Sequence, residues 1–292
     1  MNPQFPLYIC SKGRFKRRLT SDFLSYCKIP HFIVVEPSEV ADYKNATKDD
    51  PLVTILELDM GYKENYDTLD DLGDQRSKGA GAARNFAWDH AIKNGAPWYW
   101  IMDDNIRNFL RANNNRQIRV SDGAIFKAME DFCLRYKNLY MAGPNYFMFF
   151  PRKAKVKPVV FNTRIYSCNL IKTSIPFRWR GRHNEDTIIS LDVLSNGFCT
   201  AQFNAFLQNK MATETMAGGN TSDIYAKQGR YDVTKMLINV YPKYSRMMER
   251  FGRVHHFVDY SSFRKNKLIK CDEVKVKKGV NNYGMTIKKI SA

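Results

Sequence analysis

Residues 97–109 read PWYWIMDDNIRNF, in which an apolar and aromatic run passes directly into three short acidic or amide side chains. The run at 98–102 predicts a buried strand, and Asp103, Asp104 and Asn105 stand at its carboxyl end. Adjacent carboxylates repel each other, and removing them from water costs free energy. We therefore expect a cation at this strand end, and the remaining sequence must indicate which cation it is.

Strand and helix patterns alternate over the first 105 residues. Apolar runs predict strands at residues 6–10, 31–36, 52–58 and 98–102. Helical spacing predicts one helix within 17–29, capped by Thr20, Ser21 or Asp22, and a second within 79–95 that stops at Gly95. This alternation favours an α/β fold with a mostly parallel, Rossmann-like sheet and helices on both faces.

Sheets of this kind bind ligands beyond the carboxyl ends of their strands. Three segments that are separate in the sequence follow these strand ends: Ser11–Arg14, Glu36 and Asp103–Asn105. We therefore expect them to converge on one functional site.

The composition indicates a polyanionic partner. Lys and Arg number 46 against 29 Asp and Glu, which gives a formal net charge of +17. Such a balance usually indicates nucleic acid or an anionic membrane surface, the alternative being a charge that only keeps the chain in solution. Apolar residues make up 44% of the chain, which excludes a disordered tail.

The cysteine usage and the hydropathy indicate a cytoplasmic protein. The six cysteines, at 10, 27, 133, 168, 199 and 271, form no CxxC pair, so we expect reduced thiols and no zinc site. No apolar run approaches the ~18 residues of a membrane span, and the N-terminus lacks the pattern of a signal peptide. We expect no membrane partner.

The chemistry of the strand end favours a nucleoside diphosphate and a divalent ion. Carboxylate and amide oxygens suit Mg²⁺ or Mn²⁺ better than zinc. Small residues in SKGAGAARN (77–85) let backbone N–H groups approach a phosphate at a helix start, with Arg84 nearby as a cation. This stretch fits neither the GxGxxG fingerprint nor the P-loop, so a dinucleotide or P-loop site is not expected.

Five motifs in order along the chain resemble those of the GT-A nucleotide-sugar glycosyltransferases. They are CSKGR (10–14), VVEP (34–37), GAGAARN (79–85), WIMDDN (100–105) and RHNEDT (182–187). Within these enzymes the chain most resembles the TET/JBP-associated glycosyltransferases of bacteriophages and kinetoplastids, which glycosylate hydroxymethylated pyrimidines in DNA. The resemblance spans about residues 6–220. It implies a GT-A core at 1–220, with a donor half at about 1–110 and an acceptor half at about 111–220, and a basic extension at 221–292 packed on the core.

The resemblance implies a UDP-sugar as the donor substrate. Ser11, Lys12, Arg14 and Glu36 would hold the uridine. Arg84 and Asn85 would face the ribose and the diphosphate, with Asp103 beside them. The residues implied in donor binding are therefore Ser11, Lys12, Arg14, Glu36, Arg84, Asn85 and Asp103.

The resemblance also implies a Mn²⁺ or Mg²⁺ cofactor, because Asp103–Asn105 stand where the family carries its DxD motif. Asn105 replaces the second carboxylate, which leaves open whether Asp104 or Asn105 binds the metal; we favour Asp104 as the charged ligand. A late histidine, His256 or its neighbour His255, is the candidate third ligand. The alternative is that this histidine is only structural.

The pair Glu185 and Asp186 resembles the catalytic pair of the inverting members. Asp186 would take the proton of the acceptor hydroxyl as the general base, and Glu185 would orient the acceptor or the donor sugar. The alternative is ordinary helix chemistry, with Asn184 as the cap and two acidic residues in the first turn.

Basic runs beside aromatic residues indicate DNA as the acceptor. The residues predicted to bind DNA are Arg152, Lys153, Lys155, Arg178, Trp179, Arg180 and Arg182. Tyr146, Phe147, Phe149 and Trp179 are candidates to wedge into a duplex or to stack on an extruded base. The alternative for YFMFF (146–150) is a buried strand that hides at least two of its aromatic side chains.

Together these features predict an inverting, metal-dependent enzyme. It would move a sugar of the arabinose or glucose type from UDP onto a hydroxymethylated pyrimidine in duplex DNA, with 5-hydroxymethylcytosine favoured over 5-hydroxymethyluracil. One alternative is a glycosyltransferase for a lipid-linked or polysaccharide acceptor, against which the lack of an amphipathic membrane anchor counts. The other is a DNA-binding protein without activity on a transferase-like scaffold.

Overall fold

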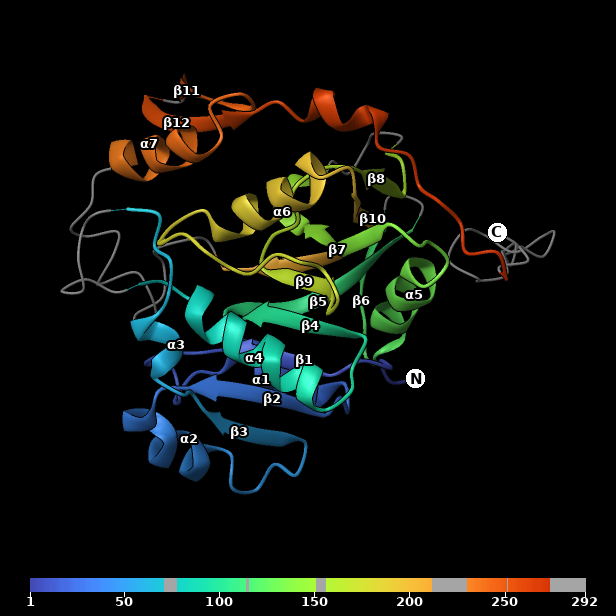
Figure 1. The fold of residues 1–292 in the computed structure, drawn as a ribbon. Coiled ribbons are helices and arrows are strands. Elements are labelled where there is room, and N and C mark those ends of the chain that lie inside the picture. The colour runs from blue at the N-terminus through green and yellow to red at the C-terminus, as the bar shows by residue number, and fades with distance from the viewer. Residues whose placement is uncertain (71–77, 114–115, 151–155, 212–229, 251, 274–292) are drawn as a thin grey trace.

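The computed structural model describes residues 1–70, 78–113, 116–150, 156–211, 230–250 and 252–273. Figure 1 shows one large twisted sheet with helices in front of and behind it, and a small layer of α7, β11 and β12 at the end opposite β3. The predicted α/β class is confirmed. All six cysteines are unpaired, as predicted.

The main sheet has the strand order β3-β2-β1-β4-β9-β7-β10-β5-β6, with β8 paired to β10. The strands β3, β2, β1 and β4 are parallel to one another, as predicted. Beyond β4 the sheet is mixed: β9 runs antiparallel to both β4 and β7, β10 runs antiparallel to β5, and β10 and β7 are parallel. The strands are β1 Leu7–Cys10, β2 His31–Val35, β3 Val53–Glu57, β4 Trp98–Asp103, β5 Ile106–Asn113, β6 Arg116–Arg119, β7 Leu139–Tyr146, β8 Val159–Phe161, β9 Cys168–Lys172 and β10 Cys199–Lys210.

Helices cover both faces of this sheet. Residues of α1 and α5 belong to one apolar cluster with the sheet, and residues of α4 and α6 belong to another. The helices are α1 Leu19–Tyr26, α2 Val40–Ala46, α3 Gly61–Glu64, α4 Gly81–Lys93, α5 Ala124–Cys133, α6 Glu185–Ser195 and α7 Arg230–Val240, with short 3₁₀ turns at Pro37–Glu39, Phe147–Phe149 and Tyr260–Lys265. In the described part of the chain, none of these helices has the length and apolar character required to cross a membrane.

The strand β4 is buried on both of its faces. Trp98, Trp100 and Met102 point into the cluster with α1 and α5, whereas Tyr99 and Ile101 point into the cluster with α4 and α6. Side chains alternate along a strand, so an unbroken apolar run is what a strand covered on both faces requires. The ladder at 98–102 therefore fixes β4 in the middle of the molecule and brings the acidic residues to its end.

The predicted cap of the first helix is wrong, since α1 begins at Leu19 and includes Thr20, Ser21 and Asp22. The Thr20 hydroxyl instead donates to the carbonyl oxygen of Asp103 at 2.6 Å and accepts from the backbone N–H of Ile106 at 2.9 Å. A side chain expected to start a helix thus holds the turn between β4 and β5.

The C-terminal elements pack on α6. Ile188, Leu191 and Leu194 of α6 form a buried cluster with Leu237 of α7 and with Phe263. This layer contains the hairpin of β11 Ser245–Arg250 and β12 Arg253–Val258. The domain boundary predicted at 220 lies outside the described residues and stays a prediction.

Candidate active site

The loop after β1 lies against the turn after β4. The Ser11 hydroxyl donates to Asp104 Oδ2 at 2.7 Å, and the Arg14 guanidinium donates to Asp104 Oδ1. The Tyr43 hydroxyl of α2 hydrogen-bonds the Ser11 hydroxyl at 2.7 Å and accepts from the Arg14 N–H at 3.1 Å. Asp104 therefore organises the loop that the sequence predicted to bind uridine.

Glu36 belongs to the same end of the sheet. Its carboxylate lies 3.1 Å from the Lys12 ammonium and also contacts Lys63 of α3. Burial alone would raise the pKa of Glu36, but these two lysines outweigh it and lower the pKa. The predicted convergence of Ser11–Arg14, Glu36 and Asp103–Asn105 is confirmed by these contacts.

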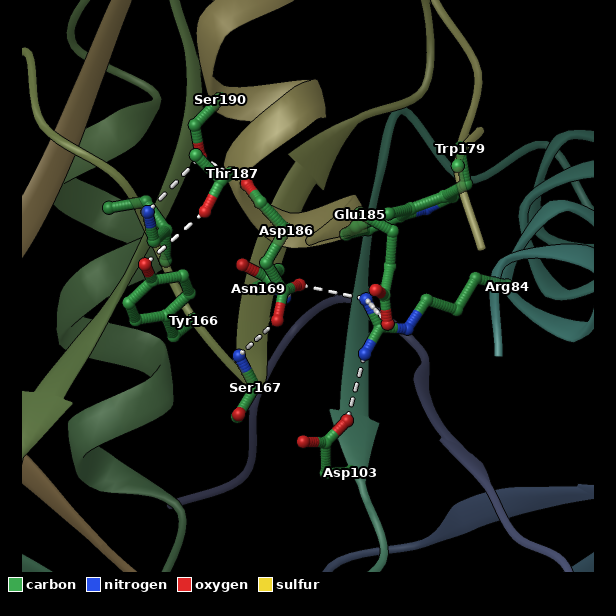
Figure 2. Close-up of polar contacts among 12 residues, drawn as sticks. Arg84, Asp103, Tyr166, Ser167, Asn169, Trp179, Glu185, Asp186, Thr187 and Ser190 are labelled. Carbon is green, nitrogen blue, oxygen red and sulfur yellow. Dashed lines mark hydrogen bonds and ion pairs between the residues drawn. The ribbon is translucent and has the colours of Figure 1, made fainter. Parts of the chain in front are cut away.

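One guanidinium gathers three carboxylates from two parts of the chain. Arg84 Nη2 lies 2.8 Å from Asp103 Oδ1, and Arg84 Nη1 lies 2.8 Å from Asp186 Oδ1 and 3.6 Å from Glu185 Oε1. The guanidinium also stacks 4.5 Å from the ring of Trp179. Figure 2 shows Arg84 between Asp103, at the end of β4, and the acidic pair at the start of α6.

A second cation completes this group. Lys210 Nζ, at the end of β10, lies 2.7 Å from Asp103 Oδ2. Burial alone would raise the pKa of Asp103, but Lys210 and then Arg84 hold it well below its ordinary value. We call Arg84, Asp103, Glu185, Asp186 and Lys210 the Arg84 cluster. Two side chains of the protein thus supply positive charge beside the acidic strand end.

Asp186 is held in place by three donors. Besides Arg84, its carboxylate accepts from Asn169 Nδ2 at 3.1 Å and from the Ser167 N–H at 3.2 Å. Burial raises the pKa of Asp186, and the charge of Arg84 opposes this rise. As the alternative supposed, Asn184 is at the N-cap position of α6, with Glu185 and Asp186 in its first turn, but the Asp186 carboxylate also contacts α4, β9 and Ser167.

The Glu185 carboxyl has a pKa raised toward neutral pH. Burial raises the pKa of Glu185 to about 7; Arg84 lowers it and the neighbouring Asp186 raises it. Its side chain retains 17% exposure, against 3% for Arg84. A carboxyl that titrates near neutral pH next to a fixed carboxylate is suited to proton transfer.

Ser167 lies at the centre of the site in a strained backbone conformation. Its φ is 61°, in the left-handed region that is unfavourable for a residue with a Cβ. Its carbonyl oxygen accepts from the Asp103 N–H at 2.8 Å, and its hydroxyl contacts Tyr146 Oη at 2.7 Å and Lys210 Nζ at 2.9 Å. Ser167 thus contacts Asp103 through its carbonyl oxygen and Asp186 through its own N–H.

Two residues predicted to bind the donor contact other groups of the protein. Arg84 is 3% exposed, and its guanidinium pairs with Asp103, Asp186 and Glu185. The Asn85 side chain donates to the carbonyl oxygen of Trp179 at 2.8 Å and accepts from the Trp179 N–H at 2.9 Å. Asn85 therefore fixes the segment before α6.

Most of the basic run at 178–182 is engaged within the protein. Trp179 is 1% exposed and donates from Nε1 to Tyr99, so it cannot stack on a base. Arg182 is buried against Asp70 at 2.8 Å, and Arg180 pairs with Asp192 at 2.8 Å. Arg178 alone of these four is about half exposed, at 45% of its side chain. Arg152, Lys153 and Lys155 lie outside the described residues.

The residues expected to bind a metal do not form a ligand set. Both carboxylate oxygens of Asp104 are engaged by Ser11 and Arg14. His256 is partly buried on β12, and its pKa is lowered to about 4 by burial and then by the charges of Arg164 and His255. Asn105 Oδ1 is buried and finds no hydrogen-bond partner in the part of the chain that the structure describes. Within the residues described, no three His, Cys, Asp or Glu side chains are grouped so that they could hold a metal ion. The binding of Mn²⁺ or Mg²⁺ by Asp104, Asn105 and His256 therefore stays a prediction.

The family of the chain follows from comparison with known proteins. A family model for the TET-associated glycosyltransferases matches residues 5–219, more than half of the chain. The chain belongs to this family. The resemblance predicted from the five motifs is thereby confirmed. The protein is a glycosyltransferase, and its family indicates that it modifies DNA.

Other comparisons add little to this family membership. No curated protein matches this TET-associated glycosyltransferase in sequence. Among solved structures it is similar to the mannose-1-phosphate geranyltransferase from Thermus thermophilus, with 10% identity and a TM-score of 0.28. That match covers 68% of this chain and 57% of the other, and so low a TM-score supports no inference.

The aromatic stretch of this TET-associated glycosyltransferase is not a buried strand. Tyr146 ends β7 and contacts Ser167, whereas Phe147–Phe149 form a 3₁₀ turn in which Met148 and Phe149 are 64% and 57% exposed. The alternative that at least two of the aromatic side chains are buried is therefore wrong. An exposed apolar tip lies directly beyond a strand that ends at the Arg84 cluster.

Three contributors to the site of this TET-associated glycosyltransferase were missed by sequence reasoning. Tyr43 lies within a short helix, Ser167 within the unremarkable stretch YSCNL, and Lys210 at the end of a long strand. Lys210 is the one with a signal that could have been used, because it too follows a strand end.

Proposed function

We propose that this TET-associated glycosyltransferase transfers a sugar from a UDP-sugar, of the glucose or arabinose type, onto the hydroxymethyl group of a modified pyrimidine in duplex DNA. We favour 5-hydroxymethylcytosine as the acceptor base and inversion at the anomeric carbon. The observation that carries the proposal is the bridge made by Arg84 between Asp103, at the carboxyl end of a parallel strand, and Asp186, at the start of α6. It brings a donor-side and an acceptor-side carboxylate to one place.

The proposed reaction assigns the proton to Asp186. The acceptor hydroxyl oxygen forms a bond to the anomeric carbon while the bond from that carbon to the diphosphate oxygen breaks, and UDP leaves. The hydroxyl proton passes to the Asp186 carboxylate. A carboxylate offers about four acceptor positions, and Arg84, Asn169 and Ser167 use three of them. One position is left for the acceptor hydroxyl.

The donor side of the proposal rests on the loop after β1. Ser11 and Arg14 are pre-organised by Asp104 and Tyr43, so little ordering of this loop remains to be done when uridine binds. Lys12, with 41% of its side chain exposed, supplies a positive charge at the same loop.

Dependence on Mn²⁺ or Mg²⁺ stays a prediction from the sequence. Mutation of Asp104 distinguishes between two roles for this residue, a metal ligand and an anchor of the Ser11–Arg14 loop. We expect Asp104→Ala to weaken UDP binding by roughly tenfold, the usual effect of losing a charge-assisted hydrogen bond, without changing the Mn²⁺ concentration that gives half-maximal binding. Calorimetric titration of UDP at several Mn²⁺ concentrations measures both quantities. A shift of that Mn²⁺ concentration to higher values would return Asp104 to the role of metal ligand.

The proposal of DNA as the acceptor is supported by exposed charge on the strand pair that leads away from the site. The strand β5 starts directly after Asn105, and β5 and β6 expose Arg107, Arg111, Arg116 and Arg119. Phe149 and Met148 add an exposed apolar tip suited to enter a base stack. A polyanionic duplex fits these features better than a neutral polysaccharide.

DNA affinity is expected to fall steeply with salt, because each phosphate contact releases condensed counterions and contributes a log-log slope of about −0.9. Replacing Arg111 and Arg116 by Ala together is expected to make the slope less negative by roughly 1.8 if both contact phosphates. Fluorescence anisotropy with a labelled duplex at several salt concentrations gives the slope. A slope near zero for the unmodified protein would favour the polysaccharide alternative.

The overall test is direct. Duplex DNA that contains 5-hydroxymethylcytosine, 5-hydroxymethyluracil or only ordinary bases is incubated with UDP-glucose or UDP-arabinose, and the nucleosides are then analysed by mass. A hexose or pentose added only to hydroxymethylated nucleosides supports the proposal. Hydrolysis of the UDP-sugar without any modified nucleoside would indicate another acceptor, and the absence of both products would indicate a binding protein without activity.

A further inference from the structure

The site lacks the cation that was expected to face the diphosphate. Departure of UDP places negative charge on the phosphate oxygens, which a nearby positive group must stabilise. Arg84 was the candidate, but it is 3% exposed and its guanidinium is occupied by Asp103, Glu185 and Asp186. A further positive group at the end of β4, beside Lys12 and the predicted divalent ion, can share in this stabilisation.

Lys210 is placed to do so. Its Nζ donates to Asp103 Oδ2 at 2.7 Å and to Ser167 Oγ at 2.9 Å, and 17% of its side chain remains exposed. A lysine ammonium carries three N–H donors, so these two contacts with described residues leave one donor for a ligand. The ammonium also lies 6.0 Å from the centre of the Tyr146 ring, which forms one wall beside it.

The backbone around Lys210 is irregular in a way that turns this side chain toward the site. The pairing of β10 with β5 shifts register between Gln208 and Lys210, and Lys210 is opposite Ile106, the first residue of β5. Just beyond it, the Met211 N–H donates to the carbonyl oxygen of Asn105 at 3.0 Å. Register shifts of this kind occur next to active sites, where they re-aim a side chain. The register shift, the ion pair with Asp103 and the remaining N–H donor all indicate that Lys210 can bind an anionic ligand.

We propose that Lys210 is a catalytic residue that binds the diphosphate of the UDP-sugar and stabilises the charge on the departing UDP. Asp103 and Ser167 hold the ammonium in position, and its third N–H donates to a phosphate oxygen. This assignment rests on the proposed glycosyltransferase function and names the fixed cation of its donor site.

Calorimetric binding of UDP and UDP-glucose tests the assignment in the full-length protein with Mn²⁺ present. Lys210→Met is expected to weaken binding of both ligands by roughly 10- to 100-fold, the usual cost of losing a charged hydrogen-bond donor. Uridine, which has no phosphate, is expected to bind both proteins equally. Lys210→Gln, which keeps an amide donor for Asp103 and loses the charge, provides the same comparison should the Met variant fail to fold.

Lys172→Met is the matched control. Lys172 also lies against a tyrosine, 4.9 Å from the Tyr140 ring, but it is opposite Trp98 at the other end of β4. It is expected to bind UDP as the unmodified protein does. Equal UDP affinity in Lys210→Gln and in the unmodified protein would overturn the assignment. Failure of the unmodified protein to bind UDP-glucose would instead overturn the proposed function, and this assignment with it.

Discussion

Asp186→Asn is expected to transfer sugar to hydroxymethylated DNA roughly 10²–10⁴-fold more slowly than the unmodified protein, the usual contribution of a general base. The amide keeps the size of the side chain but cannot take the proton of the acceptor hydroxyl. Binding of UDP-glucose is expected to change little, because Ser11, Arg14 and Lys210 lie on other segments. Single-turnover transfer at saturating donor and DNA measures the effect.

Asp192, on the same helix as Asp186, provides a control for this experiment. In the unmodified protein the Ser167 N–H donates to the Asp186 carboxylate. In Asp186→Asn the amide NH₂ can face this N–H, which leaves two donors opposed, so some loss of stability is expected as well. Asp192 of α6 is also buried, and it accepts from Arg180 at 2.8 Å and from Tyr241. Asp192→Asn is expected to lose stability to a similar extent while its transfer rate stays nearly normal. Near-normal transfer by folded Asp186→Asn protein would sink the base assignment and the preference for inversion.

Arg84→Met is expected to lower the free energy of unfolding by about 3–5 kcal/mol at pH 8, the usual cost of leaving buried charges without a partner. Asp103 keeps Lys210, but Glu185 and Asp186 lose the guanidinium that now contacts both. Urea unfolding followed by circular dichroism gives the difference. Arg180→Met is the control, since Arg180 is 35% exposed and, among the carboxylates of the described residues, pairs with Asp192 alone; its loss is expected to stay near 1 kcal/mol.

The pH dependence of this loss separates electrostatics from packing. The pKa of Glu185 is already raised from 4.5 to about 7, so between these values the folded state holds a proton that the unfolded state releases. Stability therefore falls as the pH rises through this window. Without Arg84 the folded-state pKa of Glu185 and of Asp186 should rise further, so lowering the pH from 8 to 5 is expected to recover part of the lost stability. An equal loss at both pH values would point to packing against Trp179 instead.

The sequence was most informative where local pattern and tertiary structure agree. The ladder at 98–102 predicted β4, and parallel strand ends predicted that the segments of Ser11, Glu36 and Asp103 meet. The pair Glu185 and Asp186 was found from a motif, and its convergence with Asp103 is visible in their shared guanidinium. These features depend on the alternation of side chains along a strand and on the geometry of parallel sheets, and both can be inferred from a single sequence.

Long-range pairing was what the sequence could not reveal. The run FRWRGR looked like a DNA-binding surface because its acidic partners lie elsewhere: Asp70 is 112 positions from Arg182 and hydrogen-bonds its guanidinium. The left-handed conformation of Ser167 is imposed by its neighbours in space and cannot be predicted from the residue type. The strand direction of β9 likewise depends on the path of the chain after β8.

The strand order has a consequence for how such enzymes can be recombined. In the sheet, β9 and β7 from the second half of the core lie between β4 and β10, while β5 and β6 from the middle of the chain complete the far edge beside β10. The four strands of the first 103 residues therefore lie together, but β5, which follows them directly in the chain, lies on the far side of β9, β7 and β10. A chimaera that joins the first 110 residues of one relative to the remainder of another would place its junction inside β5 and set strands of different origin side by side at the β4–β9 and β10–β5 contacts. Exchange of acceptor preference through individual side chains and loops would leave these strand contacts intact.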